Sequence, residues 1–168
     1  IDVGAPRKGF HAVALVHGAY HSATASPDAR RIADWCRDLD ADVIAIDAPC
    51  AWSTPGRGRE AERALRRRGL NCFVTPTREQ AQSHPKGWYD WMLAGAALYD
   101  ALEATHPRHD GTRRERTAIE TFPHAIACAL AGKYLPAKDK AKTRRALLET
   151  LPVDTRELRS IDQIDAAL

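Results

Sequence analysis

The chain has 168 residues, a formal net charge of +3 at pH 7 and 44% hydrophobic residues. This length predicts a single domain, residues 1–168, with one hydrophobic core. No apolar run approaches the ~18 residues of a membrane span, and the four cysteines form no Cys-x-x-Cys pair, which argues against a zinc knuckle or a redox motif. Since no basic and apolar leader opens the chain, we expect a cytoplasmic protein with reduced, buried thiols.

The amino-terminal part predicts three strands followed by one helix. Ile1-Asp2-Val3-Gly4 is typical of the end of an apolar strand, and residues 10–16 and 19–25 predict two further strands of an antiparallel meander. Ser26-Pro27-Asp28 provides a helix N-cap with proline at the first helical position. Apolar residues then recur at helical spacing, which predicts a helix over residues 27–39.

The middle of the chain predicts a buried strand and two helices. Val43 to Ile46 is a short apolar run, typical of a buried parallel strand. A basic helix is expected over residues 59–68, a short strand over 71–74 and the longest helix over 87–105. The apolar side chains of that longest helix are expected to form a core stripe, and they are Trp88, Trp91, Met92, Leu98, Tyr99 and Leu102.

The carboxyl-terminal part predicts one more buried strand, over residues 115–120, and helices over 123–131 and 138–149. A last helix opens at or near Ser160. Because a strand is left unfinished at Ile1 and a helix at Leu168, we expect the natural protein to extend beyond both ends.

Acidic residues follow the predicted buried strands. Asp2 follows Ile1, Asp47 follows residues 43–46, and Glu120 ends the strand over 115–120. The carboxyl ends of parallel strands open onto a common crevice, so these acids are expected to meet there. Asp162 and Asp165 stand three residues apart in the last helix, which places both on one helix face.

Carboxylates that crowd together repel one another, so such a cluster favours a cation between them. Oxygen ligands select hard ions, which indicates Mg²⁺ or Mn²⁺. Two such ions ~3.5–4 Å apart would activate a water and stabilise the leaving oxygen in phosphodiester hydrolysis. The alternative is that each acid only caps a helix or ends a strand.

Four segments of the chain carry a resemblance to a known family. They are Ile1-Asp2-Val3-Gly4, Ile44-Ala45-Ile46-Asp47-Ala48-Pro49, Glu120-Thr121-Phe122-Pro123-His124 and Ile161-Asp162-Gln163-Ile164-Asp165-Ala166-Ala167-Leu168. In this order they resemble the predicted nucleases called domain of unknown function 429, and the resemblance covers the whole chain.

The resemblance implies a ribonuclease H-like fold, an α/β fold whose five-stranded mixed sheet of order 3-2-1-4-5 is flanked by helices. It implies that Asp2 lies on the central strand, Asp47 on its neighbour, and Asp162 and Asp165 on the last helix, with these four as metal ligands. Glu120 is implied as a further member of the catalytic set, which would ligate metal, orient a ligand or form a hydrogen bond.

Basic residues near these acids are candidates for phosphate contacts, with solvated helix faces as the alternative. The candidates are Arg57, Arg59, Arg63, Lys138 and Lys140. Arg113-Arg114 is another basic cluster that would suit nucleic acid as a partner. His124 is either a proton shuttle or a hydrogen-bonded structural residue.

Three functions remain open. The first is a nuclease in which metal-activated water attacks a DNA or RNA phosphodiester. The second is a nucleotide-dependent phosphotransferase, because Asp2-Val3-Gly4 also resembles the first phosphate loop of the actin and sugar-kinase group. The third is a non-catalytic nucleic-acid-binding module. The nuclease is favoured because no second Asp-x-Gly loop follows an apolar strand in a chain of this length.

Overall fold

A computed structural model describes residues 1–112, 115–136 and 138–168, so Arg113 and Arg114 lie outside the described residues. The architecture is α/β. In chain order the elements are β1 (Asp2–Val3), β2 (Phe10–Val16), β3 (Ala19–Ser26), α1 (Ala29–Asp38), β4 (Val43–Ile46), α2 (Glu60–Arg67), α3 (Arg78–Gln82), α4 (Asp90–Leu102), β5 (Thr117–Glu120), α5 (Pro123–Ala131), α6 (Lys140–Leu148) and α7 (Ile161–Ala167).

The strands form two sheets, and the expected five-stranded mixed sheet of order 3-2-1-4-5 is therefore wrong. An antiparallel sheet has the order β1-β2-β3, and a separate parallel sheet pairs β4 with β5. Between β1 and β4 the chain makes only an isolated parallel bridge, from Asp2 to Asp47.

The short length of β1 explains why no continuous ladder joins the two sheets. The backbone N–H of Asp47 donates to the carbonyl of Ile1 at 2.9 Å, and the amine of Ile1 donates to the carbonyl of Ala45 at 2.7 Å. Beyond these bonds, Pro49 has no N–H to offer a neighbouring strand. The pairing thus ends after one bridge, although it still sets Asp2 beside Asp47.

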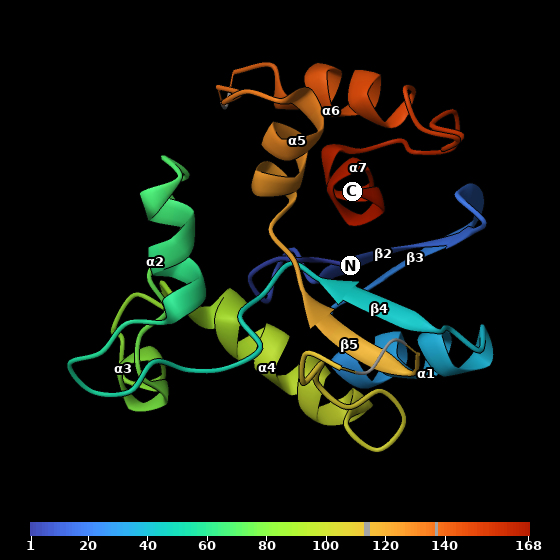
Figure 1. Cartoon of the computed structure of the whole chain (residues 1–168). Coiled ribbons are helices and arrows are strands. Elements are labelled where there is room, and N and C mark those ends of the chain that lie inside the picture. Colours follow the sequence, from blue (N-terminus) through green and yellow to red (C-terminus); the bar gives the residue numbers. More distant parts are fainter. Residues whose placement is uncertain (113–114, 137) are drawn as a thin grey trace.

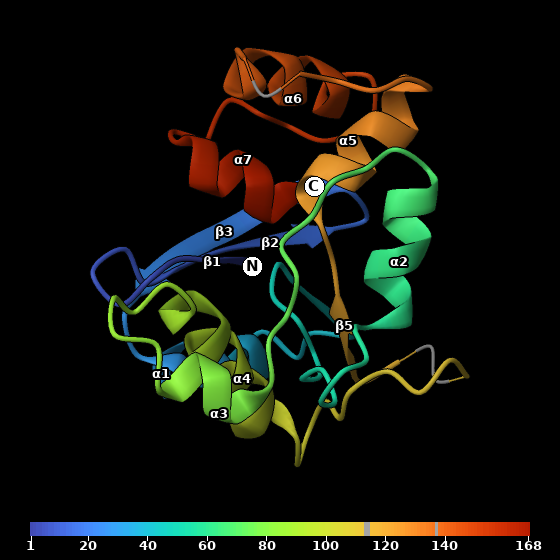
Figure 2. The same cartoon turned by 90° about the vertical axis from the view of Figure 1, so that its left-hand side faces the viewer.

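Helices lie on both sides of the strands (Figure 1). Helices α1 and α4 pack together on one side, while α7 lies against β1 and β2 on the other, next to α6. A quarter turn of the molecule shows the same layers, with α5, α6 and α7 together above the three-stranded sheet (Figure 2). The carboxyl-terminal helix is thereby brought to the first strand.

Helix α4 approaches the end of β4 more closely than an ordinary side chain would allow. Gly95 faces Ala48, and a Cβ placed on Gly95 would come within 2.3 Å of the Ala48 Cβ. The hydroxyl of Tyr99 also donates to the carbonyl of Ala48 at 3.3 Å. Tyr99 is 1% exposed. Gly95 and Tyr99 therefore fix the backbone that carries Asp47.

Most predicted helices and strands are present, but one predicted strand and one predicted core residue are not observed. Residues 71–74 form no strand, so that prediction was wrong. Trp88 is 58% exposed, so it is not part of the core, whereas Met92, Leu98 and Leu102 are buried as expected. Among the described residues, no helix is long and apolar enough to cross a membrane.

Candidate functional site

Four of the five acids predicted to meet, all except Glu120, lie near one another at the junction of β1, β4 and α7. Asp2 and Asp47 face each other across the isolated bridge. Burial is the main cause that raises the pKa values of both, and the nearby charge of Asp165 raises them further. The charge of Asp162 also raises the pKa of Asp2. The four carboxylates therefore form one electrostatic cluster, called the acidic cluster below.

The start of α7 positions its two acids. The hydroxyl of Ser160 accepts from the backbone N–H of Gln163 at 3.2 Å, and the Gln163 side chain accepts from the N–H of Ser160 at 3.3 Å. This reciprocal cap fixes the first turn. Ile164 is 2% exposed and packs with core residues below the helix. Asp162 and Asp165 consequently lie toward β1.

An ammonium group bridges two of the carboxylates. Nζ of Lys8 lies 3.2 Å from Oδ2 of Asp2 and 2.7 Å from Oδ1 of Asp162. Burial alone would lower the pKa of Lys8, but Asp162 and Asp2 together raise it. The Lys8 stem passes so close to Gly4 that a Cβ there would lie 2.7 Å from it. The sequence of this loop thus directs a cation into the cluster.

Asp165 has cations of its own. It is 7% exposed and pairs with the guanidinium of Arg144, while Nζ of Lys140 lies 3.7 Å away. Both basic residues lie on α6, which packs against α7. Asp165 is therefore compensated within the protein.

Asp47 differs from the other three acids. No hydrogen bond or ion pair joins its carboxylate to another side chain of the described residues. Burial, chiefly, and then the charges of Asp2 and Asp165 raise the pKa of Asp47 to about 7, against the opposing effects of the amino terminus and Arg144. A nearby positive charge would lower that pKa. Asp47 is thus the acid of the cluster that is least compensated.

The donor set suits a hard divalent ion, because all four groups are carboxylates. Their arrangement does not form a metal site, since within the described residues no three His, Cys, Asp or Glu side chains are placed so that they could hold a metal ion. Lys8 lies between Asp2 and Asp162 instead. An ion would bind here only if the Lys8 ammonium moved aside. With a side chain 46% exposed, it has solvent to move into.

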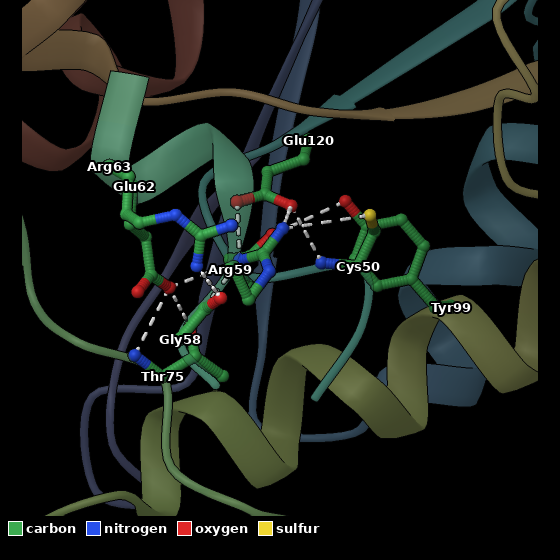
Figure 3. Close-up of polar contacts among 9 residues, drawn as sticks. Cys50, Gly58, Arg59, Glu62, Arg63, Thr75, Tyr99 and Glu120 are labelled. Atoms are coloured by element: carbon green, nitrogen blue, oxygen red, sulfur yellow. Dashed lines mark hydrogen bonds and ion pairs between the residues drawn. The ribbon is translucent and has the colours of Figure 1, made fainter. Parts of the chain in front are cut away.

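Glu120 has a different partner from the one expected of a metal ligand (Figure 3). Glu120 on β5 lies opposite Ile46 on β4, and Ile46 is the residue that precedes Asp47. Its two oxygens accept from the guanidinium of Arg59, with an Nη1–Oε1 distance of 2.8 Å, and Oε2 also accepts from the N–H of Cys50 at 3.0 Å. Burial alone would raise the pKa of Glu120, but the bond from Arg59 outweighs it and the pKa falls.

A cavity of about 260 Å³ connects Glu120 with Asp47. We call it the Glu62 cavity; it lies among α2, the segment 72–75, α4 and the ends of β4 and β5. Besides Glu62 on α2, it is lined by Arg59, Leu65, Phe73, Trp91 and Met92. The acidic cluster therefore borders this cavity at Asp47.

Glu62 has an unusual environment. It is 4% exposed, and its Oε1 accepts from the backbone N–H and the hydroxyl of Thr75 at 3.1 Å and 2.5 Å. Its Oε2 has no hydrogen-bond partner among the described residues. Leaving a buried acceptor without a donor costs about 1–3 kcal/mol. This oxygen therefore does not contribute to stability as it stands.

The predicted phosphate contacts are dispersed. Arg59 pairs with Glu120 and Glu62, and Arg63 pairs with Glu60 and donates to the carbonyl of Gly58. Lys140 is near Asp165. The two remaining candidates, Arg57 and Lys138, are exposed and have no side-chain ion pair in the part of the chain that the structure describes.

His124 lies on α5, close to the basic residues of α6. Burial and then the charges of Arg144 and Lys140 lower its pKa. Its ring makes edge contacts with Phe122 and Tyr134, at centroid distances of 5.8 Å and 5.6 Å. The side chain therefore favours the neutral form.

Sequence reasoning missed Lys8, Arg144 and Glu62. For Lys8 a signal was present, since it lies in the short turn between the first two strands, six residues after the first acid. Arg144 and Glu62 are members of basic helices, where nothing in the sequence separates a buried charge from its exposed neighbours.

Comparisons with known proteins give one result. No curated protein and no solved structure matches the chain. A family model described as "Protein of unknown function (DUF429)" matches residues 1–168. The chain therefore belongs to the DUF429 family.

Proposed function

We propose that this protein is a Mg²⁺- or Mn²⁺-dependent nuclease that hydrolyses phosphodiester bonds of nucleic acid at the acidic cluster. The observation that carries the proposal is the meeting of four carboxylates from three distant parts of the chain. Asp2 and Asp47 come from the strands, and Asp162 and Asp165 come from α7. Clusters of this kind are unfavourable unless positive charge neutralises them.

Each acid has a distinct part in the proposal. Asp2, Asp47 and Asp162 would hold the ion. Without an ion, the Lys8 ammonium supplies the positive charge between Asp2 and Asp162. When bound, a hard divalent ion supplies Lewis acidity and a water activated for attack on phosphorus. Asp165, paired with Arg144, would orient the cluster from α7.

Nucleic acid is the proposed substrate because exposed basic residues are present to contact phosphates. Arg57 and Lys138 have no acidic partner in the described chain, and Lys140 is 48% exposed at the edge of the cluster. A cytoplasmic location is also proposed. All four cysteines are free thiols, which is typical of proteins in a reducing compartment.

The proposal is tested by a cleavage assay on labelled single-stranded DNA, single-stranded RNA, duplex and junction substrates, with Mn²⁺ or with EDTA. Asp47→Asn is the informative variant because it breaks no side-chain ion pair. We expect cleavage by the wild type with Mn²⁺ only, and a loss of about 100-fold or more in Asp47→Asn.

The matched control is Asp34→Asn on the exposed face of α1, where the carboxylate is 60% exposed and pairs with Arg37. It should cleave like the wild type. Cleavage that persists in EDTA or in Asp47→Asn would refute the proposal, as would the lack of Mn²⁺-dependent cleavage of all four substrates.

A further inference from the structure

Two exposed aromatic side chains lie at the edge of the Glu62 cavity. Phe73, which lines the cavity, is 59% exposed, and Trp88, in the segment between α3 and α4, is 58% exposed. Their rings meet edge to face with centroids 6.4 Å apart, and the Phe73 ring also meets the ring of Trp91 at 5.9 Å. Large aromatic side chains that gather in water are unfavourable for a free protein, so this pair indicates a surface that binds a partner.

The segment that carries Trp88 is ordered by a side chain of its own. Nδ1 of His84 accepts from the backbone N–H groups of Lys86 and Trp88, each at 3.4 Å. The backbone N–H of Gly87 donates to the carbonyl of His84 at 3.1 Å. The Trp88 ring is therefore held in place before a partner arrives, which lowers the entropy cost of binding.

An open cleft continues from the Glu62 cavity past these rings. It has a volume of about 750 Å³ and lies between residues 53–58 and the segments 74–77 and 83–89. In Figure 1 residues 53–58 belong to the chain that runs from the end of β4 past α3 to α2. Thr75 lines both the cleft and the Glu62 cavity, and Asp47 lines the cavity. The acidic cluster, the cavity and the cleft therefore follow one another across the surface.

The charge of the cleft favours an anion. Arg57 lines it, and no Asp or Glu of the described residues does so, hence the name Arg57 cleft. A tight turn carries this arginine, because the N–H of Arg57 donates to the carbonyl of Thr54 at 3.0 Å. The N–H of Ser53 donates to the carbonyl of Pro76 at 3.1 Å and fixes the turn to the opposite wall. The guanidinium is thus placed by the backbone while its side chain stays exposed.

Two further exposed cations lie near the aromatic pair. Lys86 precedes Trp88 in the same turn. Burial raises the pKa of the Cys72 thiol, and the nearby charge of Arg66 opposes this, so Arg66 lies close to the residue before Phe73. In the part of the chain that the structure describes, neither Lys86 nor Arg66 forms an ion pair with an acid. Unpaired cations around exposed rings favour a polyanion over an apolar protein surface.

We propose that Phe73 and Trp88 each stack on an unpaired base of a single-stranded nucleic acid, whose phosphates contact Arg57 as the strand follows the Arg57 cleft. Aromatic platforms beside basic grooves are typical of proteins that bind single strands, because every base has a face that can stack. In a duplex the bases already stack on one another, so their faces are not free. The inference rests on the proposed nuclease function and makes its substrate single-stranded beside the cleavage point.

The test compares a labelled single strand of about 12 nucleotides with the duplex of the same sequence. Binding is measured by fluorescence anisotropy in EDTA, so that it does not depend on cleavage. We expect the wild type to bind the single strand about tenfold more tightly than the duplex. Phe73→Ala and Trp88→Ala should each weaken single-strand binding about tenfold through lost stacking. Arg57→Met should lower the slope of log affinity against log salt by about 0.7, the value of one phosphate contact.

Two control variants match these changes in chemistry. Tyr134→Ala removes an aromatic side chain that is 61% exposed but lines neither the Arg57 cleft nor the Glu62 cavity. Arg31→Met removes an exposed arginine of α1. Both should bind like the wild type. Since Phe73 and Trp88 are each more than half exposed, their variants should fold, and either one suffices for the test if the other does not.

Equal affinity for single strand and duplex would overturn the proposal, as would unchanged single-strand binding by both Phe73→Ala and Trp88→Ala. Lack of oligonucleotide binding would also overturn it, and self-association that Trp88→Ala abolishes would then identify an interface between copies of the chain. Single-strand binding without any cleavage contradicts the nuclease proposal alone. Cleavage by Phe73→Ala and Trp88→Ala with the KM of the wild type contradicts the stacking surface alone.

Discussion

Asp47 lies opposite Asp2 across a single parallel bridge, and its backbone N–H donates to the carbonyl of Ile1 at 2.9 Å. Backbone bonds, and not the carboxylates, therefore hold the two acids side by side. Substitutions of the carboxylates should change the chemistry of the acidic cluster without dissolving its framework. This separation makes the following predictions accessible to experiment.

Asp47→Asn should change the pH dependence of stability. Burial, helped by Asp2 and Asp165, raises the pKa of Asp47 to about 7 in the folded protein, against about 3.9 in an unfolded chain. The folded state thus binds the proton more tightly, and this stabilisation is lost as the pH rises from about 4 through about 7. In EDTA, the free energy of unfolding of Asp47→Asn minus that of the wild type should increase by about 2 kcal/mol as the pH rises from 5 to 8. Urea unfolding at both pH values measures the gain, and an unchanged difference would contradict the shift.

Lys8→Met should let Mn²⁺ take the position that the Lys8 ammonium occupies between Asp2 and Asp162. The variant leaves Asp2 and Asp162 without their shared ammonium, which should cost about 1 kcal/mol in EDTA because Lys8 is half exposed. Mn²⁺ should then raise the melting temperature of Lys8→Met more than that of the wild type. Arg7→Met, an exposed neighbour in the same loop, is the control. If Mn²⁺ stabilised both variants equally, Lys8 would not stand where the ion binds.

Glu120→Gln should be far more costly than Glu60→Gln. The first removes one of the two carboxylates beside Arg59, whose side chain is 12% exposed; because Glu62 remains 3.5 Å from the guanidinium, we expect a cost of about 2 kcal/mol. The second breaks exposed pairs with Arg63 and Arg67, which contribute about 0.5 kcal/mol. Thermal unfolding of both variants distinguishes the cases. Equal costs would show that the Glu120 pair is not structural.

Gly95→Ala should destabilise the protein although alanine is the better helix former by about 1 kcal/mol. The added Cβ would lie 2.3 Å from the Cβ of Ala48, so α4 or the end of β4 must move. Overpacking of this kind costs about 1–3 kcal/mol. Gly69→Ala, where a Cβ would meet nothing within 4 Å but φ is +77°, separates the clash from backbone strain. A stability gain in Gly95→Ala would contradict the close approach.

Local sequence signals predicted much of the fold. The Ser160 cap, the apolar run at 43–46 and the periodicity after residue 90 each correspond to an observed element. The sheet was harder to predict. Whether β1 and β4 share a ladder depends on how many residues pair, and a two-residue strand followed at the neighbour by Ala48-Pro49 allows only one bridge. Hydrophobic patterns do not record that difference.

The sequence likewise predicted one part of the site, its acids, but not their partners. Acids at the ends of apolar segments were visible, and the structure gathers Asp2, Asp47, Asp162 and Asp165. The partners of these acids were not visible, because an ion pair depends on which helices meet. Arg59, a candidate for phosphate, instead pairs with Glu120 on β5, which lies 61 residues further along the chain. Nothing in a basic helix marks which arginine turns inward.

The most direct test of the central claim is a calorimetric titration with Mn²⁺ of the wild type, Asp47→Asn and the surface control Asp34→Asn. We expect heat of binding in the wild type and in Asp34→Asn, and its loss in Asp47→Asn, because Asp47 is the least compensated acid of the cluster. Equal binding by all three proteins, or no binding by the wild type, would show that these carboxylates do not hold a divalent ion.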